Sequence, residues 1–441
     1  MKINKIIAVL LIGFLFQSCL FHEEDIFDKP AYVRLTEAVR FNLENFKSAP
    51  NGWEMRYFPT NTQMGYTLLA KFHDTEFVTM MGRNATTGNN DLIATSRFTV
   101  RPSEGAVLSF DTENPVIHVF SQPNVSGLPL GTGFGGDFEF VVIYATEDFV
   151  RMRGLRRGTN IEMHRMPEGK SWSQHFDEIA AMRTYLFGTN PILALNLPNA
   201  NFLLSGGGSG VFNAQRVDID TVPVIIPFIT TTYGIAFSRT FTPDIRQSDI
   251  VAQRFALNED RTQLIAFGTN TTANIQVAAA ADVFLNTMHA TTQTLVFRNS
   301  TENMSASVRA IYDMIVSGLG AFTLDFIGFT NRRQPVGNPI GPSLTILSRG
   351  LMPPPIGAFE VQGFLGFNMT RAGDNQVSLV FTGNMDDIGT TYYNDFSGVS
   401  DFVALLNGTY TVSFQGGGFA PNVFRFVCND DPNKWFDLFF R

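Results

Sequence analysis

GWEMRYFP (residues 52–59) and GYTLLAKF (residues 65–72) begin a long series of short segments rich in β-branched and aromatic residues. Gly, Pro and Asn separate these segments, a pattern typical of β-strands that end in turns. Strands this closely spaced predict antiparallel hairpins, because parallel strands would need helices between them. The predicted fold class is mainly β with a few packing helices, in antiparallel sandwich- or barrel-like domains. The strands predicted first are 53–58, 66–72, 76–81, 96–100, 106–110, 116–120, 138–144, 149–154 and 160–166.

Helical patterns divide the chain into regions. Apolar residues recur on one helical face between Pro30 and about Lys47, and Asp28 is the expected N-cap. A second helix is expected at 171–187, with Gly188 in the left-handed position after it. The predicted organisation is a signal peptide at 1–18, an acidic tether at 19–29, and helix-plus-β regions at 30–166, 167–300 and 301–441.

The later regions repeat these patterns without a fixed period. An Ala-rich helix is a candidate at 274–288, and 335–355, dense in Pro and Gly, is expected to be a loop or linker. Further helices are predicted at 304–317 and 402–406. The further predicted strands are 211–218, 222–230, 234–241, 253–257, 262–267, 322–329, 358–369, 376–382, 409–414, 424–427 and 435–440.

The N-terminal stretch MKINKIIAVLLIGFLFQSC (residues 1–19) predicts where the protein works. Its apolar run, 6–16, is too short to span a bilayer and is typical of a signal peptide. Ser18 before Cys19 resembles the lipobox of bacterial lipoproteins, although Phe16 stands where that family most often has Leu. The resemblance implies cleavage before Cys19 and acylation of its thiol, and several acyl chains together form a stable anchor. An ordinary cleaved signal, or a buried segment in which Cys19 is a small apolar residue, is the alternative.

An acidic cluster follows the cysteine at His22, Glu23, Glu24 and Asp25. It resembles the signal that sends lipoproteins of the Bacteroidetes to the outer face of the outer membrane, and a solvated acidic tether is the compatible alternative. The expected location is therefore the outer membrane, lipid-anchored and facing the exterior.

The amino-acid composition limits the classes of protein to which this chain can belong. Hydrophobic residues make up 44% and charged residues 16%, which indicates an ordered globular protein. The formal net charge of −8, without a basic stripe, argues against nucleic acid as a partner. Cys19 and Cys428 are the only cysteines, so lipidation would leave no internal disulfide. No later apolar run approaches the length of a membrane span.

Metal and cofactor motifs are weak, and we predict neither group. No two of the six histidines have the spacing that places both on one helix face. His118 and His164 are expected in strands, where they can face each other, but ordinary core or surface histidines are the simpler interpretation. Asp386 with Asp387, or residues 429–431, can supply oxygen ligands for calcium, although turns explain both clusters.

Catalytic patterns are equally weak. Asp111 and Glu113, two apart at a strand end, can point to the same side as an acid and base pair, but a turn before Pro115 also explains them. Ser209 lies in a G-x-S-x-G sequence inside the Gly-rich segment 205–210, without the strand-to-helix elbow that exposes a nucleophile. A G-x-G-x-x-G pattern at 131–136 precedes a strand, whereas a dinucleotide site needs a helix there.

Several longer stretches resemble a known family: EEDIFDKPAYVRL, SAPNGWEMRYFP, GYTLLAKF, VLSFDTENPVIHVF, GGDFEFVV and the closing NKWFDLFF. They are similar to the landmarks of a Bacteroidetes lipoprotein family known as domain of unknown function 4302. The resemblance implies a surface lipoprotein, often encoded beside outer-membrane nutrient-uptake systems and metallopeptidases. It assigns no catalytic residue.

Two functional classes remain. The first is a non-catalytic surface module that binds an extracellular ligand or an outer-membrane uptake protein, as β-rich domains with long Gly/Pro loops can. The second is a surface hydrolase of glycans or peptides whose active site has no recognisable motif, with Asp111, Glu113 and His118 as its candidates. We expect the first, because the sequence holds no credible catalytic set.

Overall fold

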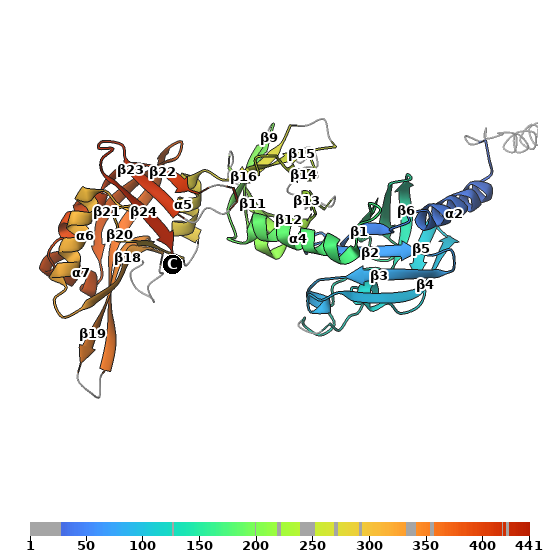
Figure 1. Cartoon of the computed structure of the whole chain (residues 1–441), viewed down its shortest axis with the longest axis horizontal. Helices are drawn as coiled ribbons and strands as arrows, with labels where there is room; N and C mark the ends of the chain where they lie inside the picture. The colour runs from blue at the N-terminus through green and yellow to red at the C-terminus, as the bar shows by residue number, and fades with distance from the viewer. Residues whose placement is uncertain are drawn as a thin grey trace, which may run out of the picture.

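The strands of the protein form three closed antiparallel barrels of eight strands each. The barrels follow one another along the long axis of the molecule (Figure 1). The predicted fold class is confirmed. The sequence left both sandwiches and barrels open, and the structure has barrels. The structure is a computed structural model and describes residues 28–125, 128–198, 200–217, 222–238, 252–268, 272–290, 293–331, 341–352, 357–416, 418–419 and 423–441.

The first barrel follows the predicted strand pattern closely. Each strand pairs with the next along the chain, and β1 pairs with β8 to close the barrel. Trp53, Met55 and Tyr57 point into the barrel core with no exposed surface, as the two-residue period of a strand requires. The strands are β1 (Trp53–Phe58), β2 (Tyr66–Phe72), β3 (Phe77–Gly82), β4 (Leu92–Pro102), β5 (Ala106–Phe110), β6 (Glu139–Ala145), β7 (Phe149–Gly154) and β8 (Asn160–Arg165).

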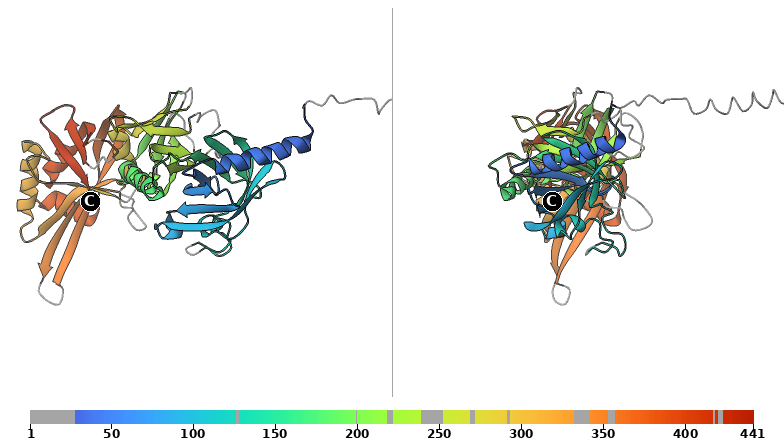
Figure 2. Two further views of the ribbon diagram at one scale, coloured as in Figure 1. Left: turned by 45° about the vertical axis from the view of Figure 1, so that its right-hand side comes forward. Right: turned by 90° about the vertical axis from the view of Figure 1, so that its right-hand side faces the viewer.

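Helix α2 (Ala31–Lys47) closes one end of this barrel and lies at the end of the row of barrels (Figure 2). The ring of Phe46 enters the barrel core, and its carbonyl accepts a hydrogen bond of 2.9 Å from the Trp53 indole. The predicted Asp28 cap is wrong. Pro30 occupies the N-cap position, and no side chain caps the helix, because Asp28 lies two residues before that position.

A short helix replaces the strand predicted at 116–120. Helix α3 (Pro115–His118) begins where the Asn114 side chain accepts a hydrogen bond from the Val116 amide, and Pro115 suits its first position. Val116 and Ile117 still pack into the barrel core. Burial explains their apolar character, so the composition of this segment did not distinguish helix from strand.

The second barrel is closed by β9 pairing with both β10 and β16. The helix considered for 274–288 is correct only in its second half, because residues 274–277 form strand β16 and the helix begins at Ala280. The strands are β9 (Leu193–Leu197), β10 (Ala200–Ser205), β11 (Val211–Arg216), β12 (Val224–Thr230), β13 (Gly234–Phe237), β14 (Arg254–Leu257), β15 (Gln263–Ala266) and β16 (Asn274–Val277).

Helix α4 (Trp172–Phe187) belongs to both of the first two barrels. Its first half packs Phe176 on the outside of the first barrel, and Leu186 and Phe187 at its end enter the core of the second. The Ser171 hydroxyl caps it by accepting a hydrogen bond from the Gln174 amide. The left-handed conformation predicted for Gly188 is wrong: its φ is −60°, because the chain continues the right-handed turn there.

The third barrel begins earlier than predicted. Strand β17 pairs with β18 and β24, so the boundary between the second and third regions lies before residue 294 and not at residue 300. The loop predicted at 335–355 contains strand β19, because its Pro and Gly residues fall mainly outside the alternating segment 343–352. The strands are β17 (Thr294–Phe297), β18 (Thr323–Thr330), β19 (Ser343–Met352), β20 (Gly357–Gly373), β21 (Gln376–Met385), β22 (Gly408–Gln415), β23 (Val423–Cys428) and β24 (Trp435–Phe440).

A helix ahead of each barrel contributes to that barrel's core. Phe46 of α2, Phe187 of α4 and Phe284 of α5 have this role in the first, second and third barrels. Four of the described helices, α5 among them, pack on the third barrel. These helices are α5 (Ala280–Ala290), α6 (Ala306–Gly318), α7 (Asp387–Asp395) and α8 (Val399–Leu406). In the described part of the chain, none of the helices has both the length and the apolar character that a membrane crossing requires.

Candidate binding cleft between the first two barrels

The structure does not assemble the candidate acid and base pair into a site. Asp111 and Glu113 are both exposed, and the Asp111 carboxylate accepts a hydrogen bond of 3.3 Å from the Thr99 hydroxyl. His118 lies on a helix and not on the predicted strand, and its Nδ1 accepts a hydrogen bond of 3.0 Å from the Asn114 amide. Local turn and helix contacts therefore account for this segment.

The candidate metal ligands have structural roles. The His118 ring lies 4.7 Å from the Phe138 ring in a tilted arrangement, whereas His164 lies in β8 beside Phe149, so these two histidines have separate environments. Asp386 caps α7 by accepting a hydrogen bond from the Gly389 amide, and it also accepts one from the Phe364 amide of β20. Within the described residues, no group of three or more His, Cys, Asp or Glu side chains could hold a metal ion.

The remaining candidate site residues either lie in turns and loops or fall outside the described residues. Asp431 accepts a hydrogen bond from the Asn433 amide in a turn, and Ser209 donates to the Gly206 carbonyl in a short 3₁₀ helix. The glycines at 131 and 133 lie in a loop before β6, as expected. Cys19 and the acidic cluster at 22–25 lie outside the described residues.

A cleft of about 350 Å³ lies between the first two barrels. Its walls come from the start of β2, the loop between β3 and β4, helix α4 and the end of β12. Phe176 and Phe228 give it apolar surface, and Thr67 and Thr230 add hydroxyl groups. A concave site of this size, mainly apolar with a few polar groups, is the usual form of a small-ligand site.

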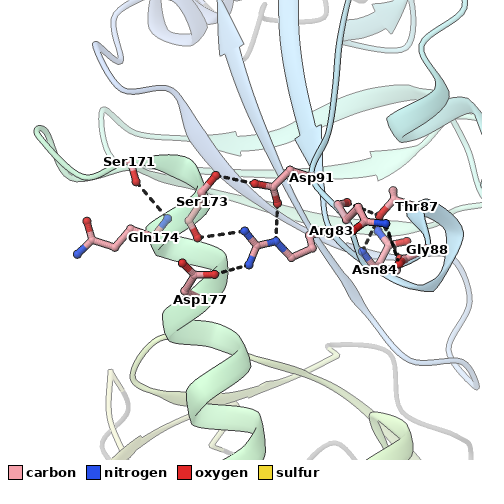
Figure 3. Close-up of polar contacts among 10 residues, drawn as sticks. Arg83, Asn84, Thr87, Gly88, Asp91, Ser171, Ser173, Gln174 and Asp177 are labelled. Atoms are coloured by element: carbon pink, nitrogen blue, oxygen red, sulfur yellow. Dashed lines mark hydrogen bonds and ion pairs between the residues drawn. The ribbon is translucent and has the colours of Figure 1, made fainter.

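Arg83, which lines the cleft, is the centre of an ionic network (Figure 3). The guanidinium of Arg83 bonds to Asp91 from its own loop and, at 2.5 Å, to Asp177 from α4. The Ser173 hydroxyl donates to Asp91 at 2.6 Å, which ties the start of α4 to the same loop. Hydrogen bonds from Arg83 lower the pKa of Asp91, so the network is ionised at neutral pH. The network therefore holds the loop between β3 and β4 against helix α4.

Two other cleft residues have donors that this network does not use. Arg183 donates a 2.6 Å hydrogen bond to the Gly208 carbonyl and has no carboxylate partner in the described part of the chain. The Asn84 side-chain oxygen accepts hydrogen bonds from Thr86, but its Nδ2 group has no partner there. The cleft can therefore recognise a ligand that carries a negative or hydrogen-bond-accepting group.

Two glycines allow the barrels to approach each other beside the cleft. A Cβ on Gly65 would lie 2.3 Å from Cγ1 of Ile229 in the second barrel, and the Gly65 amide donates to the Phe228 carbonyl at 3.4 Å. Gly210 has a φ of +77°, and a Cβ there would lie 2.8 Å from Cβ of Met64. Larger residues at either position would force the barrels apart.

A buried ion pair lies under the same junction. Glu54 and Arg56 point outward from β1, yet both are under a tenth exposed, and their side chains are 2.6 Å apart. Nε2 of His175 in α4 lies 3.1 Å from Glu54, and the ring of Tyr233 from the second barrel lies 5.4 Å from the Arg56 guanidinium. Burial raises the pKa of Glu54, but Arg56 and His175 outweigh it and hold that pKa well below its usual range.

Sequence reasoning did not identify these junction residues. Glu54 and Arg56 alternate with buried residues in WEMRYF, which is the pattern of a strand with one solvated face. Only the presence of Glu and Arg two apart on one face could have suggested an ion pair. Nothing in the local sequence indicates that α4 and a second barrel cover that face.

The sequence at 23–248, just over half of the chain, matches the protein family described as Domain of unknown function (DUF4302). The chain belongs to this family. The match covers the first barrel, α4 and much of the second barrel, and so includes the whole junction cleft. No curated protein matches the sequence.

The matches to solved structures have very low TM-scores. The β subunit of DNA polymerase from Streptococcus pyogenes matches at 10% identity over 92% of this chain and 98% of its own, with a TM-score of 0.12. The DNA polymerase III subunit β sliding clamp of Bartonella birtlesii matches at 10% identity over 91% and 97%, and the DNA polymerase III subunit β of Pseudomonas aeruginosa at 8% over 92% and 98%, both with TM-scores of 0.12. Scores this low carry no argument about fold or function.

Proposed function

We propose that this DUF4302 protein is a lipid-anchored module on the outer surface of a Bacteroidetes outer membrane, where it binds a ligand or partner during nutrient capture. The observation that carries the binding role is the junction cleft, with the donors of Arg183 and Asn84 at its wall. The N-terminal signal features and Cys19 support the anchor, and the cluster 22–25 supports export to the surface.

The order of the barrels supports this arrangement. Helix α2, which follows the tether, and the third barrel lie at opposite ends of the row (Figure 1). Acyl chains on Cys19 would therefore hold the protein by its first-barrel end and leave the second and third barrels projecting from the membrane. The junction cleft would lie between the anchored end and the projecting end, accessible from the surroundings.

The anchor is tested by comparing the full-length protein with Cys19→Ala in the native cell. We expect the unaltered protein in the outer-membrane fraction, labelled by a membrane-impermeant amine reagent on intact cells. The Cys19→Ala protein should leave that fraction. Equal distribution of the two proteins would contradict lipid anchoring, and an unlabelled membrane-bound protein would contradict surface exposure.

The binding role is tested by recovering the intact lipidated protein through a C-terminal tag and identifying what comes with it by mass spectrometry. A partner that binds the cleft should be recovered stoichiometrically, and Arg183→Ala should lower its recovery. Arg349→Ala is the matched control, because it removes the same charge from the third barrel. A partner that both variants retain equally would contradict a role for the cleft.

A further inference from the structure

A second polar cleft, of about 400 Å³, lies at the rim of the first barrel. The turn after β1, the loop before β6 and the turn between β7 and β8 form it. Of its nine lining residues, only Phe58 and Pro59 have apolar side chains, and none is acidic. The cleft therefore suits a polar ligand, and its chemistry differs from that of the junction cleft.

Arg157 is the charged group of this rim cleft. Its side chain is exposed, and Nη1 lies 3.6 Å from the point that a Cβ on Gly135 would occupy, so the guanidinium reaches from its turn to the loop before β6. Glu139, the acidic residue at the start of β6, lies within ion-pair distance of Arg101 and Arg156 instead. No carboxylate in the described part of the chain pairs with Arg157, which leaves its side-chain N–H donors available for a ligand.

The turn that presents Arg157 is held from inside the barrel. Asp137, 4% exposed, accepts hydrogen bonds from the backbone amides of Arg156 and Arg157 at 3.3 and 3.0 Å, and from the Thr159 hydroxyl at 3.2 Å. A Cβ on Gly154 would lie 2.0 Å from Oδ2 of Asp137, so this position requires glycine. The backbone beneath Arg157 is therefore fixed before any ligand arrives, which lowers the entropic cost of binding.

Arginines are concentrated on the strand and turn that lead to the rim cleft, although the whole chain carries −8. Arg151 and Arg153 alternate with buried residues on β7, and neither forms an ion pair with another described residue. Arg156 lies in the same turn as Arg157, with its side chain 76% exposed. Because Arg156 lies 4.0 Å from Glu139 and Arg151 is the register partner of Glu162, Arg153 and Arg157 are the arginines of this group that can attract an anion.

We propose that the rim cleft binds a saccharide that carries a carboxylate. Arg157 holds the carboxylate through paired N–H donors, a geometry that guanidinium and carboxylate groups share. The amide of Asn61 and the hydroxyl of Thr60, which also line the cleft, bond to sugar hydroxyls. A peptide terminus fits less well, because its side chains would need more apolar wall than Phe58 and Pro59 provide. The choice of a saccharide rests on the proposed role in nutrient capture.

The test is calorimetric titration of the full chain, purified in detergent, with trigalacturonate at 50 and 150 mM salt. The neutral galactose trimer of the same linkage is the reference ligand. We expect binding of the charged trimer only, a loss of about tenfold or more in affinity for Arg157→Ala, and a smaller loss for Arg157→Lys, which keeps the charge without the paired donors. Because Arg157 is exposed, both variants should keep the barrel fold, which circular dichroism checks.

Arg349→Ala is again the matched control, since it removes one charge far from the rim cleft. Equal losses for Arg157→Ala and Arg349→Ala would assign the binding to net charge and overturn the proposal. Acetate or N-acetyl-triglycine binding as tightly as trigalacturonate would overturn the choice of a saccharide, and no binding of the charged trimer would overturn the site. These outcomes are independent of the anchoring and recovery experiments, because the purified chain needs neither a membrane nor a partner.

Discussion

The two junctions between the barrels are built from different chemistry. The first depends on the buried Glu54–Arg56 pair and on the ionic network of Arg83. The second is apolar: Phe419, from the segment between β22 and β23 of the third barrel, is fully buried in the core of the second. In return, Ile192 and Leu203 of the second barrel pack against the core of the third.

This difference indicates how each junction can respond to its surroundings. Apolar contacts depend on the area removed from water and change little with pH or salt. A buried ion pair adds little net stability but depends strongly on the charge of each partner. The cleft between the second and third barrels, about 340 Å³, has no charged residue in its lining. We therefore expect the first junction to be the adjustable one and the second to be a fixed connection.

Glu54→Gln should have the largest effect. It keeps the size of the side chain but leaves the Arg56 charge buried without a counter-charge, which costs about 3–5 kcal/mol of the free energy of unfolding. Because three barrels need not unfold together, differential scanning calorimetry is the suitable measurement. The transition of the first barrel should fall in temperature, and that of the third should stay in place.

A double variant separates the charge from the packing. Glu54→Leu with Arg56→Met removes both charges and should recover most of the stability lost in Glu54→Gln, because paired apolar replacements of buried ions are often neutral. If the double variant were less stable than Glu54→Gln, the pair itself, and not the unpaired charge, would be the stabilising feature.

Phe419→Ala should have the next largest effect. Removing a buried Phe costs about 3 kcal/mol, the lower end of the usual range, because a segment between strands can relax around the cavity. The second and third barrels should become easier to separate, which limited proteolysis and calorimetry can measure, while the first barrel is unaffected. Phe41→Ala is the control, since Phe41 is 50% exposed in α2 and its removal should have little effect. Equal effects of the two changes would contradict an interlocked apolar junction.

Local patterns in the sequence predict the elements better than the contacts between barrels. The alternation in WEMRYF and GYTLLAKF identifies β1 and β2, and Ser171 before an apolar helical face identifies the start of α4. The division of that face between two barrels is not a local property: Phe176 packs on the first barrel and Leu186 in the second. A helix that packs against two barrels has the same apolar sequence pattern as a helix that packs against one.

The repeated architecture was hidden for a related reason. A helix whose Phe enters the core of the following barrel occurs three times, at Phe46, Phe187 and Phe284. Packing requires an apolar residue of suitable size at each place but no common spacing, so the repeat leaves no sequence period. The same argument applies to the candidate site, because Arg83 and Arg183 are one hundred positions apart and meet at one cleft only through the placement of α4.

Acid should destabilise the first barrel, where His164 on β8 is the register partner of Glu54, by the smallest of the three effects. Burial lowers the pKa of His164, which lies beside Glu162, below its ordinary value of 6.5. The folded protein therefore resists protonation that the unfolded chain accepts, so stability is complete above about pH 6.5 and falls as the pH decreases. Glu54, whose pKa is also lowered, adds a second loss of the same sign below its ordinary value of 4.5.

Calorimetry across this pH range compares the two junctions directly. The first-barrel transition should move to lower temperature as the pH falls, while the transition of the third barrel, whose junction cleft has no charged lining, should move less. His164→Gln should remove the loss between pH 7.5 and 5.5 and keep the loss below pH 4.5, because Glu54 remains. A parallel shift of both transitions, unchanged by His164→Gln, would mean that acid acts on the whole surface charge and not on the ionic junction.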